Sequence, residues 1–268
     1  MRTITIPGTN LHCSKFIFGT ANLFNGRAQR QRIALLEAAA DHGFTHFDTA
    51  PYYGFGMSER DLSGVLKRHP ELTVTTKVGI YSPGGEEQPA AAVFLRKAAG
   101  QLIPSISRPT IDFHLGRART ALEDSLRRLG RERVDLYMLH EPQIDLVETD
   151  EWLSWLEACR REGKIGAFGI ASLTSGLPPF LQQAPGLTGV VQTFDSLDGK
   201  EADILRHGGR PLQITYGYVS AAFSRAKRMT VEDVLRAAVQ RNSEGAIIVS
   251  TSRRERLAQY ARLLETAP

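Results

Sequence analysis

The sequence is poor in cysteine and has no long apolar run. Cys13 and Cys159 are the only two cysteines among 268 residues. They have neither metal-ligand nor redox spacing, so no disulfide framework is expected and both thiols are interpreted as inert packing residues. No apolar stretch approaches the length needed to span a bilayer, and the N-terminus lacks the apolar core of a signal peptide. These absences favour a globular protein in a reducing, cytoplasmic setting, with no membrane partner and no metal site.

Charge of one sign is not concentrated in any segment. The 33 basic and 29 acidic residues give a formal net charge of +4, and they are scattered along most of the chain. A nucleic-acid-binding tail would show a basic run, so we expect a solvated mixed surface and no nucleic-acid partner. With 42% hydrophobic and 23% charged residues, the chain can bury a substantial core and has no compositional mark of disorder.

Short apolar, β-rich runs alternate with longer stretches of helical spacing, which is typical of repeated strand–helix units and a parallel sheet. The expected strands are residues 15–21, 45–50, 72–78, 134–140, 165–172, 189–195, 211–218 and 245–252. The expected helices are residues 28–43, 58–69, 116–130, 150–163, 177–184, 200–208, 230–242 and 253–265. Eight units of each kind predict a closed α/β barrel, the (β/α)8 TIM barrel, as a single domain over residues 1–268.

Local signals at helix ends agree with this fold. Ser58 with Asp61, and Thr230 with Asp233, resemble capping boxes at the start of two helices. Glycines stand where left-handed caps are expected after three helices, namely Gly43, Gly130 and Gly163.

Three segments lie outside the repeating pattern. The segment "TITIPGTNLH" predicts an N-terminal β-hairpin that covers the bottom of the barrel. Residues 82–109 are rich in proline and glycine and predict an ordered excursion above the barrel, with a short helix over residues 90–100. Residues 217–230, after the seventh strand, are expected to form a short loop.

Four ionisable residues occupy ends of the expected strands. Asp48, Lys77 and His140 close the second, third and fourth strands, and Tyr53 follows in the loop after the second. Active sites of such barrels lie at the carboxyl ends of the strands, so the four side chains are expected to share one cavity. Lys77 is the most informative of them, because a buried ammonium needs a partner and the chain has only seven lysines against 26 arginines.

This set makes chemical sense as a device that protonates a carbonyl oxygen. A phenol with a pKa near 10 is a weak acid at neutral pH unless a neighbouring cation stabilises its phenolate. Lys77 can supply that cation, Asp48 can hold Lys77 charged, and His140 can position the substrate oxygen while Tyr53 acts as general acid. No side chain carries hydride, so a nicotinamide cofactor is expected to supply it.

At this point the sequence resembles the aldo-keto reductase superfamily. The stretch "GFTHFDTAPYYGFGMSERDLSGVL" carries the family's Asp and Tyr spacing, "TTKV" its Lys, and "LEDSLRRLGRERVDLYMLHEP" its His. The resemblance extends from Phe18 to about Leu257, and the residues around "FDTAPYYGFGMSER" look most like bacterial sugar and small-aldehyde members, including aldose dehydrogenases. It implies reduction of an aldehyde, ketone or sugar, or the reverse oxidation, with the catalytic residues Asp48, Tyr53, Lys77 and His140.

The resemblance also implies positions for the cofactor. Gln192 matches the family's carboxamide-binding glutamine, and Tyr216 matches the aromatic residue that stacks on the nicotinamide. The family's Ser-Asn pair after the fifth strand is replaced here by Ala171-Ser172. The full set of expected cofactor-binding residues is Gly19, Thr20, Ala21, Asp48, Ser172, Gln192, Tyr216, Ser250, Thr251, Ser252, Arg253 and Arg256. The expected substrate pocket contains Phe24, Tyr52, Tyr81, Glu141 and Tyr218.

The arginines after the last strand bear on the identity of the cofactor. Arg253, Arg254 and Arg256 follow the helix start at which family members bind the adenosine phosphate, and they could grip a 2′-phosphate. This favours NADP (NADPH), with NAD as the alternative. The competing interpretation is an arginine-rich helix start that is simply solvated.

Two other interpretations of the chain stay open. The segment "GFGMSE" follows a strand and opens a helix as in a doubly wound dinucleotide-binding fold, although Glu59 stands where the third glycine is required. The second is a cofactor-binding barrel that acts as a regulatory or redox-sensing subunit without significant turnover. The physiological substrate, the direction of the reaction and the number of subunits are not encoded in any motif.

Overall fold

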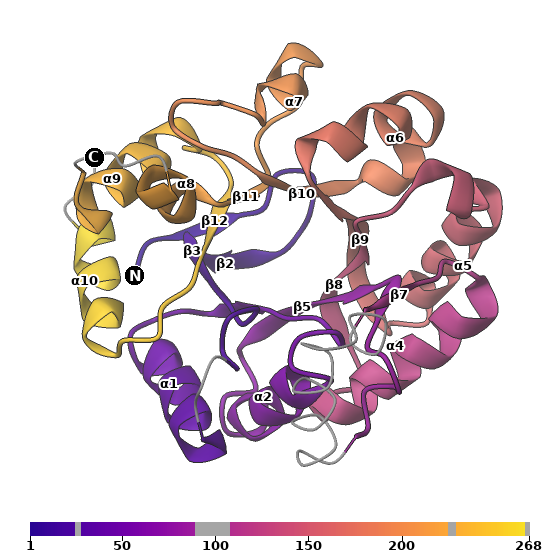
Figure 1. The fold of residues 1–268 in the computed structure, drawn as a ribbon, viewed down its shortest axis with the longest axis horizontal. Coiled ribbons are helices and arrows are strands. Elements are labelled where there is room, and N and C mark those ends of the chain that lie inside the picture. Colours follow the sequence, from indigo (N-terminus) through magenta and orange to yellow (C-terminus); the bar gives the residue numbers. More distant parts are fainter. Residues whose placement is uncertain (25–27, 89–107, 225–228, 266–268) are drawn as a thin grey trace.

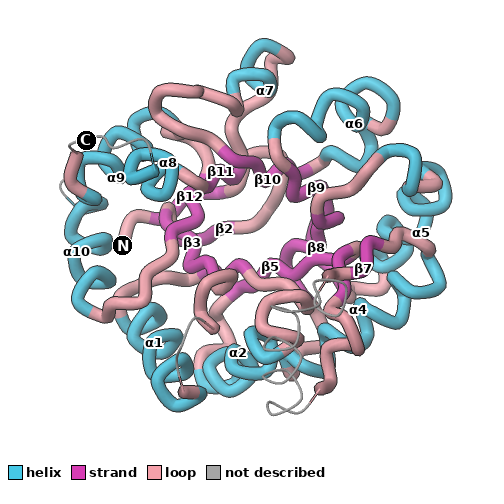
Figure 2. Tube along the Cα trace, in the orientation of Figure 1, coloured by secondary structure: helices cyan, strands magenta, loops and turns pink. Residues whose placement is uncertain are grey.

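Eight parallel strands form a closed barrel in the computed structural model, which describes residues 1–24, 28–88, 108–224 and 229–265. Figure 2 shows these strands as a central ring surrounded by helices. The barrel strands are β3 (Phe16–Gly19), β4 (His46–Asp48), β5 (Thr73–Val78), β8 (Val134–His140), β9 (Ile165–Ser172), β10 (Val190–Phe194), β11 (Ile214–Tyr216) and β12 (Ala246–Val249). The predicted TIM barrel is confirmed, and the doubly wound alternative is wrong because its sheet would be open.

The helices of the strand–helix units pack around the outside of the barrel (Figure 1). They are α1 (Gln29–Asp41), α2 (Met57–Arg68), α4 (Leu115–Leu129), α5 (Thr149–Arg161), α6 (Leu177–Gln183), α7 (Asp203–His207), α9 (Val231–Arg241) and α10 (Glu255–Glu265). Short 3-10 turns cover Ile144–Leu146, Thr174–Gly176 and Pro185–Thr188. Helix α4 illustrates the packing, because its apolar stripe, which includes Leu122 and Leu126, is buried.

One further helix, α8 (Tyr218–Ser224), lies in the segment after β11 that was predicted to be a short loop. That prediction is wrong. Tyr218, Ala221 and Ala222 are buried at helical spacing, so an apolar stripe stabilises a helix of seven residues. The hydroxyl of Tyr218 donates to Asp195 at 2.7 Å, and Arg241 of α9 also donates to Asp195 at 2.6 Å. This network holds α8 beside α9.

The ends of several helices behave as the sequence predicts. Thr230 caps α9 by accepting a hydrogen bond from the backbone N–H of Asp233, whose carboxylate accepts from the backbone N–H of Thr230. The three glycines expected in left-handed caps have φ values of 84°, 64° and 79°, for Gly43, Gly130 and Gly163 respectively. These backbone conformations favour glycine because it has no Cβ.

The capping box predicted at Ser58 and Asp61 is wrong. α2 begins at Met57, its N-cap is Gly56 in the left-handed region, and Ser58 lies buried inside the helix. Asp61 instead accepts a hydrogen bond from Nε of Arg32 in α1 at 2.6 Å. The turn before the helix is tighter than the sequence pattern indicates, so the helix starts before the residue that resembled a cap.

The N-terminal hairpin closes one end of the barrel. β1 (Thr3–Thr5) pairs antiparallel with β2 (His12–Ser14), as predicted. Ile6 and Cys13 are fully buried and pack with inward-facing residues of the barrel strands, including Ile17 and Leu136. Burial raises the pKa of the Cys13 thiol to about 12, which agrees with a packing role. The barrel therefore has an apolar floor at the amino ends of its strands.

The excursion predicted at residues 82–109 begins and ends at a short two-stranded sheet. β6 (Ile80–Tyr81) pairs antiparallel with β7 (Thr110–Ile111). The short helix expected over residues 90–100 lies outside the described residues. The two strands bring the ends of the excursion together beside the carboxyl end of β5.

A buried histidine forms part of the polar interior of the barrel. Nδ1 of His46 lies 2.7 Å from Oγ1 of Thr73, and its Nε2 lies 2.7 Å from Oγ1 of Thr75. Burial, together with the charge of Lys77, lowers the pKa of His46 from 6.5 to about 3. The imidazole is therefore neutral in the folded protein at neutral pH.

Because of this buried histidine, we expect the folded protein to lose stability in acid. Between pH 6.5 and about 3 the unfolded chain binds a proton at His46 and the folded protein does not, so stability falls as the pH falls. As the pH falls by one unit, the free energy of unfolding should decrease in both proteins. The decrease should be larger in the wild type than in His46→Gln by up to about 1.4 kcal/mol. Urea unfolding across this range checks it, with His114→Gln as an exposed control. Parallel pH slopes for wild type and His46→Gln would contradict the assignment.

Candidate active site

The four ionisable residues from the strand ends meet in one place. Nζ of Lys77 lies 2.6 Å from Oδ1 of Asp48 and 3.3 Å from the hydroxyl of Tyr53. It also donates to the carbonyl of Thr49 at 2.9 Å. The ring of His140 stands edge-on to the ring of Tyr53, with centroids 5.8 Å apart. Residues separated by up to 92 positions thus form one cluster at the carboxyl ends of β4, β5 and β8.

Lys77 and Asp48 form a fully buried ion pair, with side-chain exposures of 1% and 5%. Burial raises the pKa of Asp48, while the charge of Lys77 acts in the opposite direction. Burial alone would lower the pKa of Lys77, but the charges of Asp48 and Tyr53 raise it above its ordinary value. The ammonium therefore stays charged at neutral pH and is fixed beside the phenol.

The phenol and the imidazole are both neutral groups at neutral pH. Burial raises the pKa of Tyr53, and the charge of Lys77 pulls it back down. Burial, reinforced by the charge of Lys77, lowers the pKa of His140 to about 3. Tyr53 thus carries a proton that it can donate, next to a cation that stabilises its conjugate base. The neutral His140 can donate a hydrogen bond from one ring nitrogen.

A tight turn between β4 and α2 places Tyr53. Three successive residues of this turn, Gly54, Phe55 and Gly56, have positive φ values of 63°, 59° and 77°. A Cβ on Gly54 would lie 2.2 Å from the ring of Phe24, and a Cβ on Gly56 would lie 2.5 Å from the carbonyl oxygen of Glu86. The "GFG" sequence is therefore required by a backbone that packs closely on both sides, and it does not bind a nucleotide in a doubly wound fold.

Arg60 fixes this turn and was not singled out from the sequence. Its guanidinium donates to the carbonyl of Phe55 at 3.0 Å and to the carbonyl of Glu86 at 2.6 Å. It thereby links the Tyr53 turn to the first residues of the segment after β6. No sequence motif points to this role, because both acceptors are backbone carbonyls.

The cluster opens into a cavity of about 500 Å³. The cavity lies at the carboxyl ends of the strands and extends toward α8, α9 and α10. Its lining residues are Gly19, Ala21, Asn22, Asp48, Tyr53, Lys77, His140, Glu141, Ala171, Gln192, Tyr216, Gly217, Tyr218, Val219, Ser220, Phe223, Leu235, Ile247, Ile248, Val249, Ser250 and Tyr260. In several barrel strands, the last inward-facing residue lines this cavity. Barrel active sites are usually built in this way.

Comparison with known proteins places the chain in a family. The sequence model described as "Aldo/keto reductase family" matches residues 15–176, which include all four residues of the cluster. The chain belongs to the aldo/keto reductase family. It is 36% identical over 160 residues to D-threo-aldose 1-dehydrogenase from Pseudomonas sp, covering 58% of this chain and 47% of that protein. It is 30% identical over 183 residues to NADH-specific methylglyoxal reductase from Escherichia coli, covering 65% and 52%.

Solved structures agree on the fold of this aldo/keto reductase. The holo form of an aldo-keto reductase from Bacillus halodurans superposes with a TM-score of 0.76 at 20% sequence identity, covering all of this chain and 92% of that chain. At that identity the likeness shows the barrel alone. The chain spans about half the length of the curated relatives that it matches.

Besides Asp48, five residues that were predicted to bind the cofactor line the cavity next to the strand-end cluster. They are Gly19, Ala21, Gln192, Tyr216 and Ser250. Gln192 is 4% exposed, and its Oε1 has no hydrogen-bond partner among the described residues. A carboxamide N–H₂ group would satisfy that oxygen, so the residues present fit a nicotinamide.

The other predicted cofactor residues lie outside this lining. Thr20 is fully buried and donates to the carbonyl of Asp48, and Ser172 donates to Glu141 at 3.3 Å. The turn before α10 and its first residues carry the rest: Ser252, Arg253 and Arg254 are exposed, whereas Thr251 and Arg256 are half-buried. Thr251 accepts a hydrogen bond from the backbone N–H of Arg253 at 3.0 Å, which shapes this turn.

The predicted substrate residues divide into two groups. Glu141 and Tyr218 line the cavity, whereas Phe24, Tyr52 and Tyr81 do not. The ring of Phe24 packs against Arg32 at 4.0 Å under the Tyr53 turn. The ring of Tyr81 lies 3.8 Å from the guanidinium of Arg117. In their place, Val219 and Phe223 of α8 line the cavity, and the helical spacing of Tyr218, Ala221 and Ala222 was the signal that could have found them.

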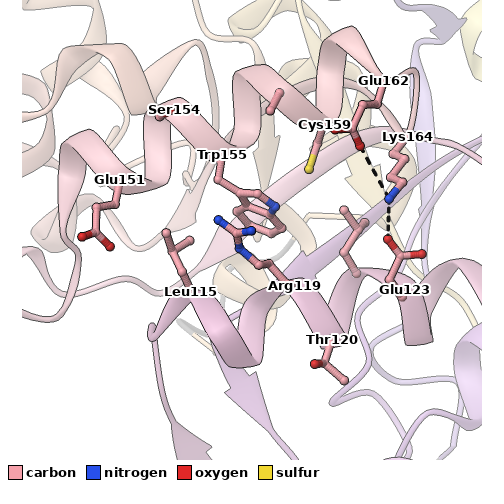
Figure 3. A pocket seen from close by; sticks show the side chains of 12 residues that line it. Leu115, Arg119, Thr120, Glu123, Glu151, Ser154, Trp155, Cys159, Glu162 and Lys164 are labelled. Atoms are coloured by element: carbon pink, nitrogen blue, oxygen red, sulfur yellow. Dashed lines mark hydrogen bonds and ion pairs between the residues drawn. The ribbon is translucent and has the colours of Figure 1, made fainter.

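A larger hollow of about 860 Å³ lies on the outside of the barrel, between α4 and α5 (Figure 3). Lys164 lies there between Glu123 at 2.7 Å and Glu162 at 3.6 Å. Cys159 also lines it, and burial raises the pKa of its thiol. Lys164 is thus paired with two carboxylates, and the hollow shares no lining residue with the strand-end cavity.

The described residues offer neither a metal-ligating cluster nor a membrane-spanning helix. Within residues 1–24, 28–88, 108–224 and 229–265, no group of three or more His, Cys, Asp or Glu side chains could hold a metal ion. None of the helices described has both the length and the apolarity needed to cross a bilayer.

The role of Arg60 predicts a change in local stability. Arg60→Ala removes two hydrogen bonds to the backbone and should speed amide exchange of Phe55, Gly56 and Met57 by about tenfold. Hydrogen–deuterium exchange checks this. Arg68→Ala, at the other end of α2 where the arginine pairs with Glu37, is the matched control. Equal protection of the turn in both variants would show that Arg60 does not hold it.

Proposed function

We propose that the protein is an NAD(P)H-dependent oxidoreductase that transfers hydride between a nicotinamide cofactor and a small carbonyl or alcohol substrate. The observation that carries the proposal is the Asp48–Lys77–Tyr53 relay, in which Nζ of Lys77 lies 2.6 Å from the carboxylate and 3.3 Å from the phenol. This relay opens into the cavity beside His140. Membership of the aldo/keto reductase family supports the same reaction class.

Each residue has a distinct task in the proposed mechanism. Gln192 and Tyr216 would hold a nicotinamide, which would supply or accept the hydride. During reduction Tyr53 donates its phenolic proton to the carbonyl oxygen, and Lys77 stabilises the phenolate that remains. Asp48 keeps Lys77 charged and oriented, while the neutral His140 donates a hydrogen bond to the substrate oxygen. In the oxidative direction Tyr53, as phenolate, takes the proton from the alcohol.

The proposed cofactor site uses the cavity and the start of α10. Gln192 would accept from the carboxamide, and Tyr216 would stack on the ring. Arg253, Arg254 and Arg256 would bind a 2′-phosphate, which supports NADPH over NADH. The Escherichia coli relative is named as NADH-specific, so the arginines and not the family carry this preference.

Substrates of sugar or small-aldehyde type are the best supported. The Pseudomonas relative is named for an aldose and the Escherichia coli relative for methylglyoxal. The regulatory alternative has no observation in its favour, because a protein that only binds cofactor has no need of a buried ammonium beside a phenol. The cytoplasmic location stays a prediction from the sequence.

If the catalytic assignment is right, removing the hydroxyl of Tyr53 should strongly reduce turnover. Tyr53→Phe should lower kcat for carbonyl reduction by at least about 100-fold, since the proton donor is lost, with cofactor affinity little changed. Oxidation of NADPH in the presence of a panel of aldehydes and aldoses, followed at 340 nm, measures it. The matched control is Tyr137→Phe, which removes a buried phenol hydroxyl outside the cavity. Unchanged turnover in Tyr53→Phe would exclude the proposed mechanism.

The cofactor assignment predicts a selective loss of affinity. A double variant, Arg253→Ala with Arg256→Ala, should raise the Kd for NADPH by roughly tenfold or more and leave the Kd for NADH nearly unchanged, because only NADPH carries the 2′-phosphate. Fluorescence titration with both nucleotides checks the difference. Arg236→Ala on α9, where the arginine pairs with Glu232, controls for loss of surface charge. Equal weakening of both nucleotides would argue against a 2′-phosphate site.

A further inference from the structure

Glu141 has an unusual backbone conformation immediately after His140. Its φ is +48°, one of three positive values among the described non-glycine residues. Its backbone N–H donates to the carbonyl of Ala171 at 2.7 Å. Non-glycine residues rarely adopt this conformation unless the surroundings hold them there. The chain therefore makes a fixed, sharp departure from β8 at the residue that follows the catalytic cluster.

The side chain of Glu141 is held as firmly as its backbone. Its Oε2 accepts hydrogen bonds from the backbone N–H of Leu173 at 3.0 Å and from the hydroxyl of Ser172 at 3.3 Å. The carboxylate thus bridges the ends of β8 and β9, while the residue lines the cavity together with Gln192 and Tyr216. A surface glutamate that was merely solvated would have no such fixed acceptor geometry.

Glu141 also sets the charge of the cavity. Among the described residues that line it, Asp48, Lys77 and Glu141 are the ones with charged side chains. The first two form an ion pair and cancel each other, and His140 is neutral because burial lowers its pKa to about 3. One negative charge is left. Its field reaches both sides of the cavity, since the charge of Glu141 contributes to raising the pKa values of Tyr53 and Tyr216.

A negative charge at this place distinguishes the two redox forms of a nicotinamide. The ring is a cation when oxidised and neutral when reduced, so a nearby carboxylate attracts the oxidised form and has much less effect on the reduced form. Because the cavity is partly shielded from solvent, this attraction is stronger than it would be in bulk water.

We propose that Glu141 is a specificity-determining residue for the redox state of the cofactor, whose carboxylate makes the cavity favour the oxidised nicotinamide nucleotide. The proposal rests on the function proposed above. At equal concentrations of the two forms, Glu141 increases the share of sites loaded with the oxidised form, which accepts hydride from the C–H of an alcohol while Tyr53 takes the O–H proton. The charge of this residue therefore biases occupancy toward a dehydrogenase.

Binding measurements test the proposal directly. Isothermal titration gives the Kd values of NADP⁺ and NADPH, and of NAD⁺ and NADH, for the wild type, Glu141→Gln and Glu141→Asp. Glutamine keeps an acceptor oxygen for Ser172 and Leu173 but removes the charge. We expect the ratio of the oxidised to the reduced Kd to rise about tenfold in Glu141→Gln and to stay within about threefold of wild type in Glu141→Asp. Glu151→Gln on α5, an exposed glutamate far from this cavity, is the matched control.

The results of these titrations distinguish a failure of the Glu141 proposal from a failure of the proposed oxidoreductase function. If the wild type binds both redox forms and Glu141→Gln weakens or strengthens both equally, Glu141 is a structural bridge between β8 and β9 and the inference is wrong. If the wild type binds no nicotinamide nucleotide at all, the proposed function fails first. A higher ratio in Glu141→Gln that Glu141→Asp restores supports a role for charge.

Discussion

The buried ion pair between Lys77 and Asp48 is the constraint on which the site depends. Removing two charges from water costs several kcal/mol for each ion, and the cost is recovered only when geometry and further hydrogen bonds are good. Here the ammonium lies 2.6 Å from Asp48 and also donates to the carbonyl of Thr49 and the hydroxyl of Tyr53. Its three donors are therefore all used. Tyr53 completes this shell, so the placement of the phenol is part of what makes the buried lysine tolerable.

Strand β5 connects this pair to the outer layer of the barrel. Side chains alternate along a strand, so Lys77 faces the cavity while its neighbour Thr76 faces the helices. The hydroxyl of Thr76 donates to Glu59 of α2 at 2.6 Å, and Arg128 of α4 donates to the same carboxylate at 2.7 Å. α2 begins at the turn that carries Tyr53. The same strand thus anchors the ammonium on one face and the helix behind the phenol on the other.

The sequence could predict the parts of this site that depend on local patterns and on the topology of the barrel. The alternating apolar pattern predicts the strands, and the strand ends bring Asp48, Lys77 and His140 together, because a parallel barrel places all carboxyl ends on one face. The pattern failed at α8, whose apolar stripe is only three residues long, and at Ser58, where a left-handed Gly56 starts the helix earlier. Arg60 was missed because its partners are backbone carbonyls of residues 55 and 86, a pairing that no spacing in the sequence reveals.

The two ends of the barrel interior differ in polarity. The hairpin residues Ile6 and Cys13 fill the floor and keep it apolar. Above them lie the polar contacts of His46 with Thr73 and Thr75, which are satisfied within the protein. Burial raises the pKa of Tyr53, and the charge of Lys77, whose Nζ lies 3.3 Å from the phenol, opposes that effect. No residue of the hairpin lines the cavity, so the floor closes the barrel while the ammonium of Lys77 offsets the effect of burial on the phenol.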